Sequence, residues 1–245
     1  MPQQLVITIS GASSGFGAMA ARALAKAGHI VYAGMRATAD RNAAQVQKCN
    51  EFSKENGVKL FAVEMDVASD ESTKAAVYQI IKDQDANAVS AHRLMCAALP
   101  HLRKQHKAYV LWVGSSSTDG GNPPYLGPYF AAKSGAFPTG TNHLANAGRP
   151  KDKDIADEYE KYYAGLSEKT GEKLAEIFPS GVGINIVAEE IVRLVNLPFG
   201  TRPYKTVIDP SNDGAEEVTN LKIAVRERYM KSMDIEDLLH PSVSK

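Results

Sequence analysis

Two side chains, Tyr129 and Lys133, are spaced for proton transfer. They lie four residues apart in the segment 128–133, and residues i and i+4 share one face of a helix. A free tyrosine titrates near pH ~10, whereas a neighbouring cation favours the phenolate and lowers the pKa of the phenol. The pair could therefore exchange a proton with an alcohol or ketone oxygen. The same spacing also fits a solvated helix face, so the surrounding motifs decide its meaning.

A glycine-rich turn near the N-terminus is placed to bind a phosphate group. It occupies residues 10–17 and follows an apolar run, 5–9, that is typical of a buried strand. An alanine-rich helix over 18–27 follows, Gly28 ends it, and 29–34 is predicted as the next strand. Amide groups at the start of such a helix face an anion, and a dinucleotide pyrophosphate is the expected ligand. The alternative is a tight turn that serves only packing.

The glycine spacing Gly11-x-x-x-Gly15-x-Gly17, together with Tyr129-x-x-x-Lys133, resembles the short-chain dehydrogenase/reductase family. The resemblance implies a doubly wound, Rossmann-like α/β fold with a mostly parallel sheet. It implies a single NAD(P)-binding domain over residues 1–245, with a substrate lid at about 140–180, in a homodimer or homotetramer. The implied reaction is hydride transfer between a nicotinamide cofactor and a small-molecule carbonyl or alcohol. A catalytically silent NADP(H)-binding sensor or scaffold, and an isomerase or lyase on the same fold, are the alternatives.

Arg36 predicts NADP(H) as the preferred cofactor, with NAD(H) possible. A site that prefers NAD usually has an acid at the end of the second strand, and the stretch 34–36 has none. The guanidinium of Arg36 can instead form a bidentate, charge-assisted pair with a 2′-phosphate. A solvated loop cation is the alternative, and Arg41 is close enough in sequence to assist.

Asp66 and Val67 follow the third predicted strand, 59–65, and precede a helix from about residue 69. The resemblance implies that Asp66 binds the adenine amino group and that Val67 packs beside the ring. The alternative for Asp66 is a helix cap or a turn aspartate.

The resemblance also assigns roles around Tyr129, which would be the general acid/base, with Lys133 lowering its pKa and holding the nicotinamide ribose. Ser116 would polarise the substrate oxygen, although Ser115 fits better relative to the end of the predicted strand 108–113. Asn87 would complete the proton relay. The cofactor-binding residues carried over are Gly11, Ser13, Ser14, Gly15, Phe16, Gly17, Arg36, Asp66, Val67, Tyr129, Lys133, Phe137 and Thr139.

Two segments of the family pattern are absent. The fourth strand and its helix are missing before Asn87, so the segment 87–102 resembles the next long helix. After Lys133, the glycine at 135 and the proline at 138 would end the catalytic helix after about one turn. A helix that short could not hold Tyr129 and Lys133 firmly. We expect the natural chain to be longer by tens of residues, on the order of the ~30 of a βαβ unit, rather than truly shortened. An intact mass of 26.4 kDa would contradict this expectation.

Composition excludes several classes of function. A formal net charge of zero gives no general affinity for nucleic acid or an anionic membrane. Two cysteines give neither a disulfide framework nor a metal-ligand spacing, and reduced thiols in the cytoplasm are the default. We see no signal-peptide pattern and no apolar run near the ~20 residues of a membrane span.

In the last third we expect a helix at 187–195, a strand at 202–208 and a charged helix at 216–230. His143 is interpreted as a surface residue rather than a substrate contact.

Overall fold

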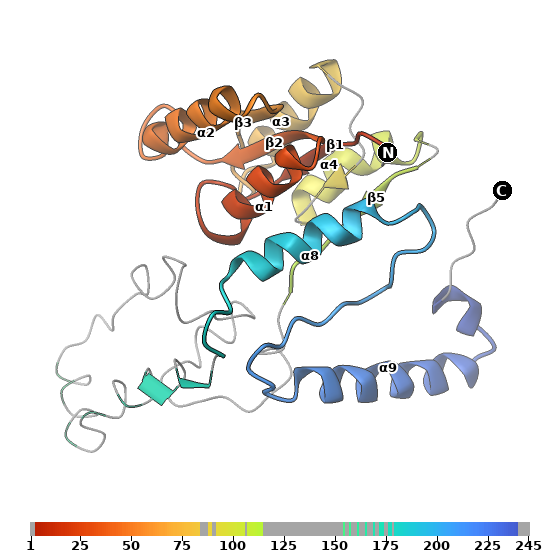
Figure 1. Ribbon diagram of the computed structural model, residues 1–245. Helices are drawn as coiled ribbons and strands as arrows, with labels where there is room; N and C mark the ends of the chain where they lie inside the picture. Colours follow the sequence, from red (N-terminus) through yellow and green to blue (C-terminus); the bar gives the residue numbers. More distant parts are fainter. Residues whose placement is uncertain are drawn as a thin grey trace. The chain divides into compact units, whose positions relative to one another are not determined.

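A five-stranded parallel sheet forms the centre of the N-terminal part of the chain (Figure 1). The computed structural model describes residues 3–83, 88–89, 92–105, 107–114 and 179–239, with scattered positions between 154 and 177. By its internal contacts the chain divides into two units. One unit comprises Met1–Val113, Gly140–Asn142 and Gly183–Leu197, and the other comprises Gly114–Thr139, His143–Val182 and Pro198–Lys245. A single domain over 1–245 stays a prediction.

The strand order is β3-β2-β1-β4-β5, and every paired strand is parallel to its neighbour. The strands are β1 (Val6–Ile9), β2 (Ile30–Met35), β3 (Leu60–Glu64), β4 (Ala88–Val89) and β5 (Tyr109–Val110). β2 is buried along its whole length, as expected for a strand that helices cover on both faces. The predicted α/β fold with a parallel sheet is therefore confirmed.

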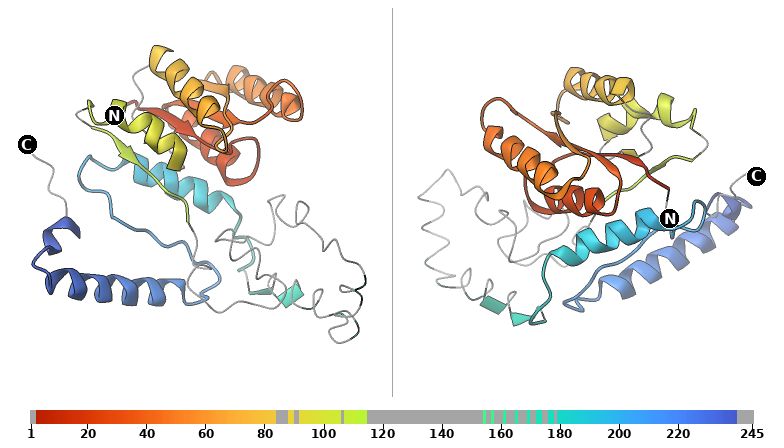
Figure 2. Two further views of the ribbon diagram at one scale, coloured as in Figure 1. Left: turned by 180° about the vertical axis from the view of Figure 1, so that it is seen from behind. Right: turned by 45° about the horizontal axis from the view of Figure 1, so that its top comes forward.

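Helices cover both faces of this sheet (Figure 2). They are α1 (Gly15–Lys26), α2 (Ala43–Asn56), α3 (Asp70–Asp83), α4 (His92–Leu102) and α8 (Asn185–Asn196). α3 and α4 lie on one face, where Ile80 and Leu94 pack in one cluster with Tyr32 of β2. α1 packs against α8, and both present buried apolar side chains. Burial of these faces supplies the main stabilisation of the unit.

Gly28 ends α1, as predicted. Its φ of 95° lies in the left-handed region that favours glycine. The amide of Gly28 donates to the carbonyl of Ala25 at 3.0 Å, and the amide of His29 donates to that of Leu24 at 3.2 Å. This pair of bonds is a Schellman motif, which satisfies carbonyls at the helix end and turns the chain into β2.

The predicted helix from Asn87 is wrong at its start, because Ala88–Val89 form β4 and the helix begins at His92. Ala88 pairs with Ile7 of β1, and Val89 pairs with Val110 of β5. The sheet position that we expected to be missing is thus filled by two residues. Their backbone groups find partners on both sides there, which a helical turn would not provide for β1 and β5.

The second unit contains α9 (Ala215–Lys231) and the short 3₁₀ helix η2 (Glu236–Leu239). α9 confirms the predicted charged helix. The predicted strand at 202–208 is wrong, since these residues form no strand and Tyr204 is 93% exposed. A β-rich composition makes a strand only where a neighbouring strand completes its hydrogen bonds. No helix within the described residues is long and apolar enough to cross a membrane.

Candidate functional site

The loops that follow β1, β2 and β3 lie at one edge of the sheet, because the carboxyl ends of parallel strands point the same way (Figure 1). The amide of Ala12 donates to the carbonyl of Gly34 at 2.9 Å, which ties the first loop to β2. The amide of Met65 donates to the carbonyl of Met35 at 2.7 Å, which ties the third loop to the second. In open α/β sheets, ligands bind in the crevice at this edge. The structure thus brings the predicted residues of all three loops to one edge.

The three glycines of the first loop meet two different physical requirements. Gly11 and Gly15 have φ angles of 66° and 56°, and a Cβ on either would meet nothing within 4 Å. Their requirement is conformational, since residues with a Cβ rarely adopt this region. Gly17 is different, because a Cβ there would lie 2.4 Å from the carbonyl oxygen of Gly11. The absence of a side chain at Gly17 lets the first turn of α1 close onto the loop.

The N-terminus of α1 faces this loop without a competing carboxylate. Ser14 is the N-cap residue, in an extended conformation, and its side chain makes no capping hydrogen bond. No acidic residue lies in the first turn of α1. The amide of Ala18 donates to the carbonyl of Ser14 at 3.3 Å, so the helical hydrogen bonding starts there. The positive end of the helix dipole is therefore not neutralised by a side chain of α1 itself, and an anion is favoured in front of it. Of the other predicted loop residues, Ser13 and Phe16 are half-buried.

Arg36 is an exposed residue directly after β2, in a loop that is held on both sides. Nδ2 of Asn42 donates to the carbonyl of Arg36 at 2.6 Å. The carboxylate of Glu64, the last residue of β3, accepts from the amides of Ala37 and Thr38 at 2.9 and 2.8 Å, and also from the Thr38 hydroxyl. The Thr38 hydroxyl and amide hold the pKa of Glu64 below its ordinary value. Arg41 is also exposed on this loop.

Asp66 takes part in a local turn. Its Oδ1 accepts from the amide of Ala68 at 2.9 Å, and its own amide donates to Oγ of Ser72 at 2.9 Å. Such bonds from an aspartate to the backbone two residues on are typical of turns. The carboxylate therefore orders the β3–α3 connection, and Val67 beside it is exposed at this edge.

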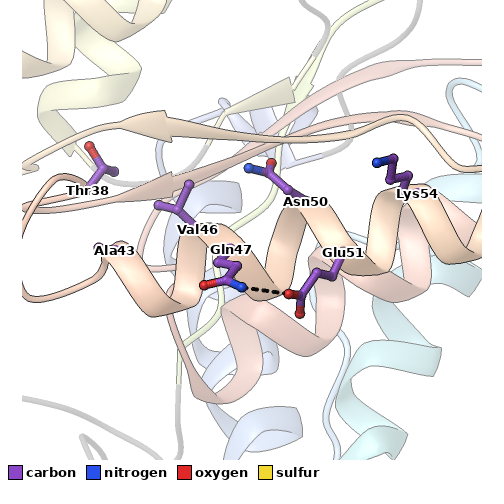
Figure 3. A pocket seen from close by; sticks show the side chains of 7 residues that line it. All are labelled: Thr38, Ala43, Val46, Gln47, Asn50, Glu51 and Lys54. Atoms are coloured by element: carbon purple, nitrogen blue, oxygen red, sulfur yellow. Dashed lines mark hydrogen bonds between the residues drawn. The ribbon is translucent and has the colours of Figure 1, made fainter.

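A separate groove of about 450 Å³ runs along α2 (Figure 3). Thr38 and α2 alone line it, and two of the lining side chains, Gln47 and Glu51, hydrogen bond to each other at 2.8 Å. The glycine-rich loop contributes nothing to its lining. The groove thus borders the loop that carries Arg36 through Thr38 and does not reach the glycine-rich loop.

The predicted catalytic residues lie outside the described residues, as do two predicted cofactor contacts and much of the lid region. They are Asn87, Ser116 with its alternative Ser115, Tyr129, Lys133, Phe137, Thr139 and His143. Their assignments stay predictions. In the part of the chain that the structure describes, no three His, Cys, Asp or Glu side chains gather as metal ligands would.

Sequence reasoning missed Glu64, Asn42 and Gly34. Glu64 reads as an ordinary exposed strand residue, since its partners are 26 and 27 positions away. A Cβ on Gly34 would lie 2.8 Å from Sδ of Met65 and 3.0 Å from the carbonyl oxygen of Ile9. The one sequence signal for this close approach is the glycine itself, which stands near the end of β2 in place of a residue with a side chain.

Comparisons with known proteins agree with this architecture. Residues 5–86 match the family model of short chain dehydrogenases. No curated protein matches the chain. An alcohol dehydrogenase from the archaeon Thermococcus sibiricus, complexed with 5-hydroxy-NADP, is 20% identical with a TM-score of 0.59, covering 84% of this chain and 96% of that one. An actinorhodin polyketide ketoreductase variant with NADPH is 17% identical with a TM-score of 0.57, covering 80% and 92%.

At these identities the solved structures show the shared fold, whereas the family model connects this fold to the sequence of the first third of the chain. The matched residues contain β1, the glycine-rich loop, α1, β2 and β3. Residues 5–86 therefore resemble short chain dehydrogenases in sequence, and the chain shares the fold of the alcohol dehydrogenase and of the ketoreductase over most of its length.

Proposed function

We propose that this protein is an NADP(H)-dependent oxidoreductase that interconverts a carbonyl and an alcohol. The observation that carries the proposal is the close approach at Gly17, where a Cβ would lie 2.4 Å from the Gly11 carbonyl oxygen. That contact brings a loop with two left-handed glycines onto an uncapped helix N-terminus. A cradle of backbone amides with no side chain in the way suits a pyrophosphate.

The residues at this edge fit a dinucleotide. The backbone of Gly11 to Gly17 would hold the pyrophosphate, Arg36 would pair with a 2′-phosphate, and Asp66 and Val67 would contact the adenine. When bound, the nicotinamide supplies or accepts the hydride. In support of NADP(H), the two similar structures described above are named as complexes with 5-hydroxy-NADP and with NADPH.

The proton chemistry is assigned to the catalytic segment by its residue types and spacing. Tyr129 would give a proton to the substrate oxygen or take one from it. Lys133 would favour the phenolate and so bring the tyrosine pKa toward neutrality. Ser116 would donate a hydrogen bond to the same oxygen, where charge changes most. Asn87 would relay the proton, and Phe137 and Thr139 would hold the nicotinamide. We propose a homodimer or homotetramer in the cytoplasm as the working form.

Direct binding and turnover test the proposal. NADPH and NADH are titrated into the protein, and a panel of ketones, aldehydes and alcohols is followed by nicotinamide absorbance. Loss of the bidentate charge at Arg36 in Arg36→Ala should weaken NADPH binding about 10- to 100-fold, since a hydrogen bond to a charged group contributes about 1.5–3 kcal/mol. NADH binding should change little. Arg103→Ala, which removes an exposed cation elsewhere, is the control and should bind both as the wild type does.

Tyr129→Phe tests the chemistry separately from binding. It should abolish turnover, because the proton-transfer group is lost. It should weaken NADPH binding by no more than about tenfold, since the ring remains and only one hydroxyl contact to the cofactor is removed. Tyr78→Phe changes a tyrosine of α3 that is 72% exposed, and it should retain full activity. Near-wild-type turnover in Tyr129→Phe would refute the assigned mechanism. Tight NADPH binding without turnover on the whole panel would favour a silent sensor, and cofactor that survives purification without net oxidation would favour an isomerase or lyase.

A further inference from the structure

Three hydrogen-bond donors of two consecutive residues converge on one carboxylate at the proposed cofactor edge. The amides of Ala37 and Thr38 and the hydroxyl of Thr38 all donate to Glu64. Glu64 lies on the neighbouring strand, in register with Met35, the last residue of β2. The carboxylate therefore clamps the two residues that follow Arg36 to the end of β3.

The backbone around Arg36 is held at every step. Met35 before it is bound to the sheet through the amide of Met65, at 2.7 Å. The carbonyl of Arg36 accepts from Asn42 at 2.6 Å, and the residues after it are bound by Glu64. The Arg36 side chain is exposed and makes no ion pair with another described residue. A cation on such a fixed backbone needs less ordering when it binds a ligand than a cation on a mobile loop.

Ala37 shows why the loop needs a clamp. Its φ is 47°, in the left-handed region that is unfavourable for a residue with a Cβ. Without the bonds from Glu64, Ala37 would relax toward an ordinary φ and change the direction in which the chain leaves Arg36. A strained residue of this kind persists where its surroundings hold it.

We propose that Glu64 is a positioning residue for cofactor selection, which holds the 36–38 loop so that Arg36 meets the 2′-phosphate of NADP(H). This inference rests on the proposed function. The alternative is that Glu64 competes with the cofactor. Its carboxylate would then occupy the amides of Ala37 and Thr38 that a 2′-phosphate would otherwise bind. The two roles predict opposite effects of removing the charge, because a clamp helps the phosphate to bind and a competitor hinders it.

The test uses the two adenosine fragments that differ only at the 2′ position. 2′,5′-ADP and 5′-AMP are titrated into the full chain by calorimetry, in the wild type and in Glu64→Gln. The amide oxygen of glutamine can accept only part of what the carboxylate accepts. We expect 2′,5′-ADP to bind about 5- to 10-fold more weakly in Glu64→Gln, the loss of about one charge-assisted hydrogen bond. 5′-AMP should bind within about twofold of the wild type.

Two further variants test the clamp itself. Ala37→Gly in the Glu64→Gln background should recover at least about threefold of the lost affinity, since glycine adopts this φ without help. A merely structural role of Glu64 would not give a rescue confined to 2′,5′-ADP. Thr38→Val removes only the hydroxyl donor, and it should weaken the binding of 2′,5′-ADP by about twofold. This variant still tests the clamp if Glu64→Gln fails to fold. Glu55→Gln, an exposed carboxylate on α2, is the matched charge control and should have no effect.

Each remaining outcome separates this inference from the proposed function. Unchanged or tighter 2′,5′-ADP binding in Glu64→Gln, with a large loss in Arg36→Ala, would overturn the clamp and leave NADP(H) binding intact. Equal losses for both fragments would also overturn it, because the effect would not involve the 2′-phosphate. If Arg36→Ala binds 2′,5′-ADP as the wild type does, the NADP(H) assignment itself fails.

Discussion

Replacing Gly17 by alanine tests the geometry of the glycine-rich loop most directly. The new Cβ would lie 2.4 Å from the carbonyl oxygen of Gly11, 2.9 Å from its carbon and 3.1 Å from Cα of Ala12. All three are backbone atoms, so no side-chain rotation relieves the contact. Loop and helix must separate by about 0.6–1 Å to restore an ordinary contact distance, and forced overpacking of this kind costs about 1–3 kcal/mol.

Two measurements follow from that displacement. For a chain of this size, 1 kcal/mol lowers the melting temperature by about 2–4 °C, so Gly17→Ala should melt about 2–12 °C lower. NADPH should bind at least about tenfold more weakly, because the amides of the loop no longer converge on one anion. Gly114→Ala is the matched control, since a Cβ there meets nothing within 4 Å and its φ is ordinary. Wild-type melting and NADPH affinity in Gly17→Ala would show that the loop does not close onto α1 as described.

Three further perturbations have defined outcomes. Burial lowers the pKa of His29, so below pH ~6.5 the unfolded chain binds more protons than the folded one. The free energy of unfolding should therefore decrease as the pH is lowered below ~6.5. Urea titrations at several pH values should show a smaller decrease in His29→Gln than in the wild type. Gly28→Ala places a Cβ at φ 95° and should cost about 1 kcal/mol or more in chemical denaturation, whereas an unchanged midpoint would argue against the left-handed cap. Exposed Cys96 should react with a thiol reagent in the native protein, whereas Cys49 should react only on unfolding, because burial shields its thiol and raises its pKa. Fast reaction of both thiols in the native protein would contradict the burial of Cys49.

Local signals predicted most of the elements of the N-terminal half. The apolar runs at 5–9 and 29–34, the glycine-rich turn and the Gly28 stop correspond to β1, β2, the first loop and the end of α1. Each depends on residues within about one turn of helix or one strand, so the sequence carries it directly. α8 and α9 were likewise recognisable, as an amphipathic helix and as a charged one.

The errors arise where pairing outweighs propensity. The residues Ala88–Val89 look like the start of a helix and become a strand, because β5 and the side of β1 away from β2 would have no partner without them. The segment 202–208 has a strand-like composition and forms no strand. Neither outcome can be read from a window of neighbours, since both depend on which distant backbone lies alongside.

For the candidate site, residue types were predictable and their connections were not. Glycines at 11, 15 and 17 indicate a phosphate loop, but only the structure separates the two conformational glycines from Gly17, which permits a close contact. Arg36 is visible in the sequence, whereas the clamp that positions it is not. Asp66 is also visible in the sequence, but only the structure shows that its carboxylate orders its own turn through the amide of Ala68; its contact with the adenine stays a prediction.

The sequence by itself determined the resemblance of residues 5–86 to short chain dehydrogenases, the order of the first βαβ unit and the residue types of the candidate nucleotide site, because these depend on local periodicity and on glycine spacing. Tertiary structure alone decided the contacts between residues far apart in the chain. Glu64 binds Ala37 and Thr38 across neighbouring strands, and His29, 2% exposed, meets Asn196 of α8 at 3.2 Å. Strand register and helix packing set such contacts, and both emerge only when the whole sheet and its covering helices are assembled.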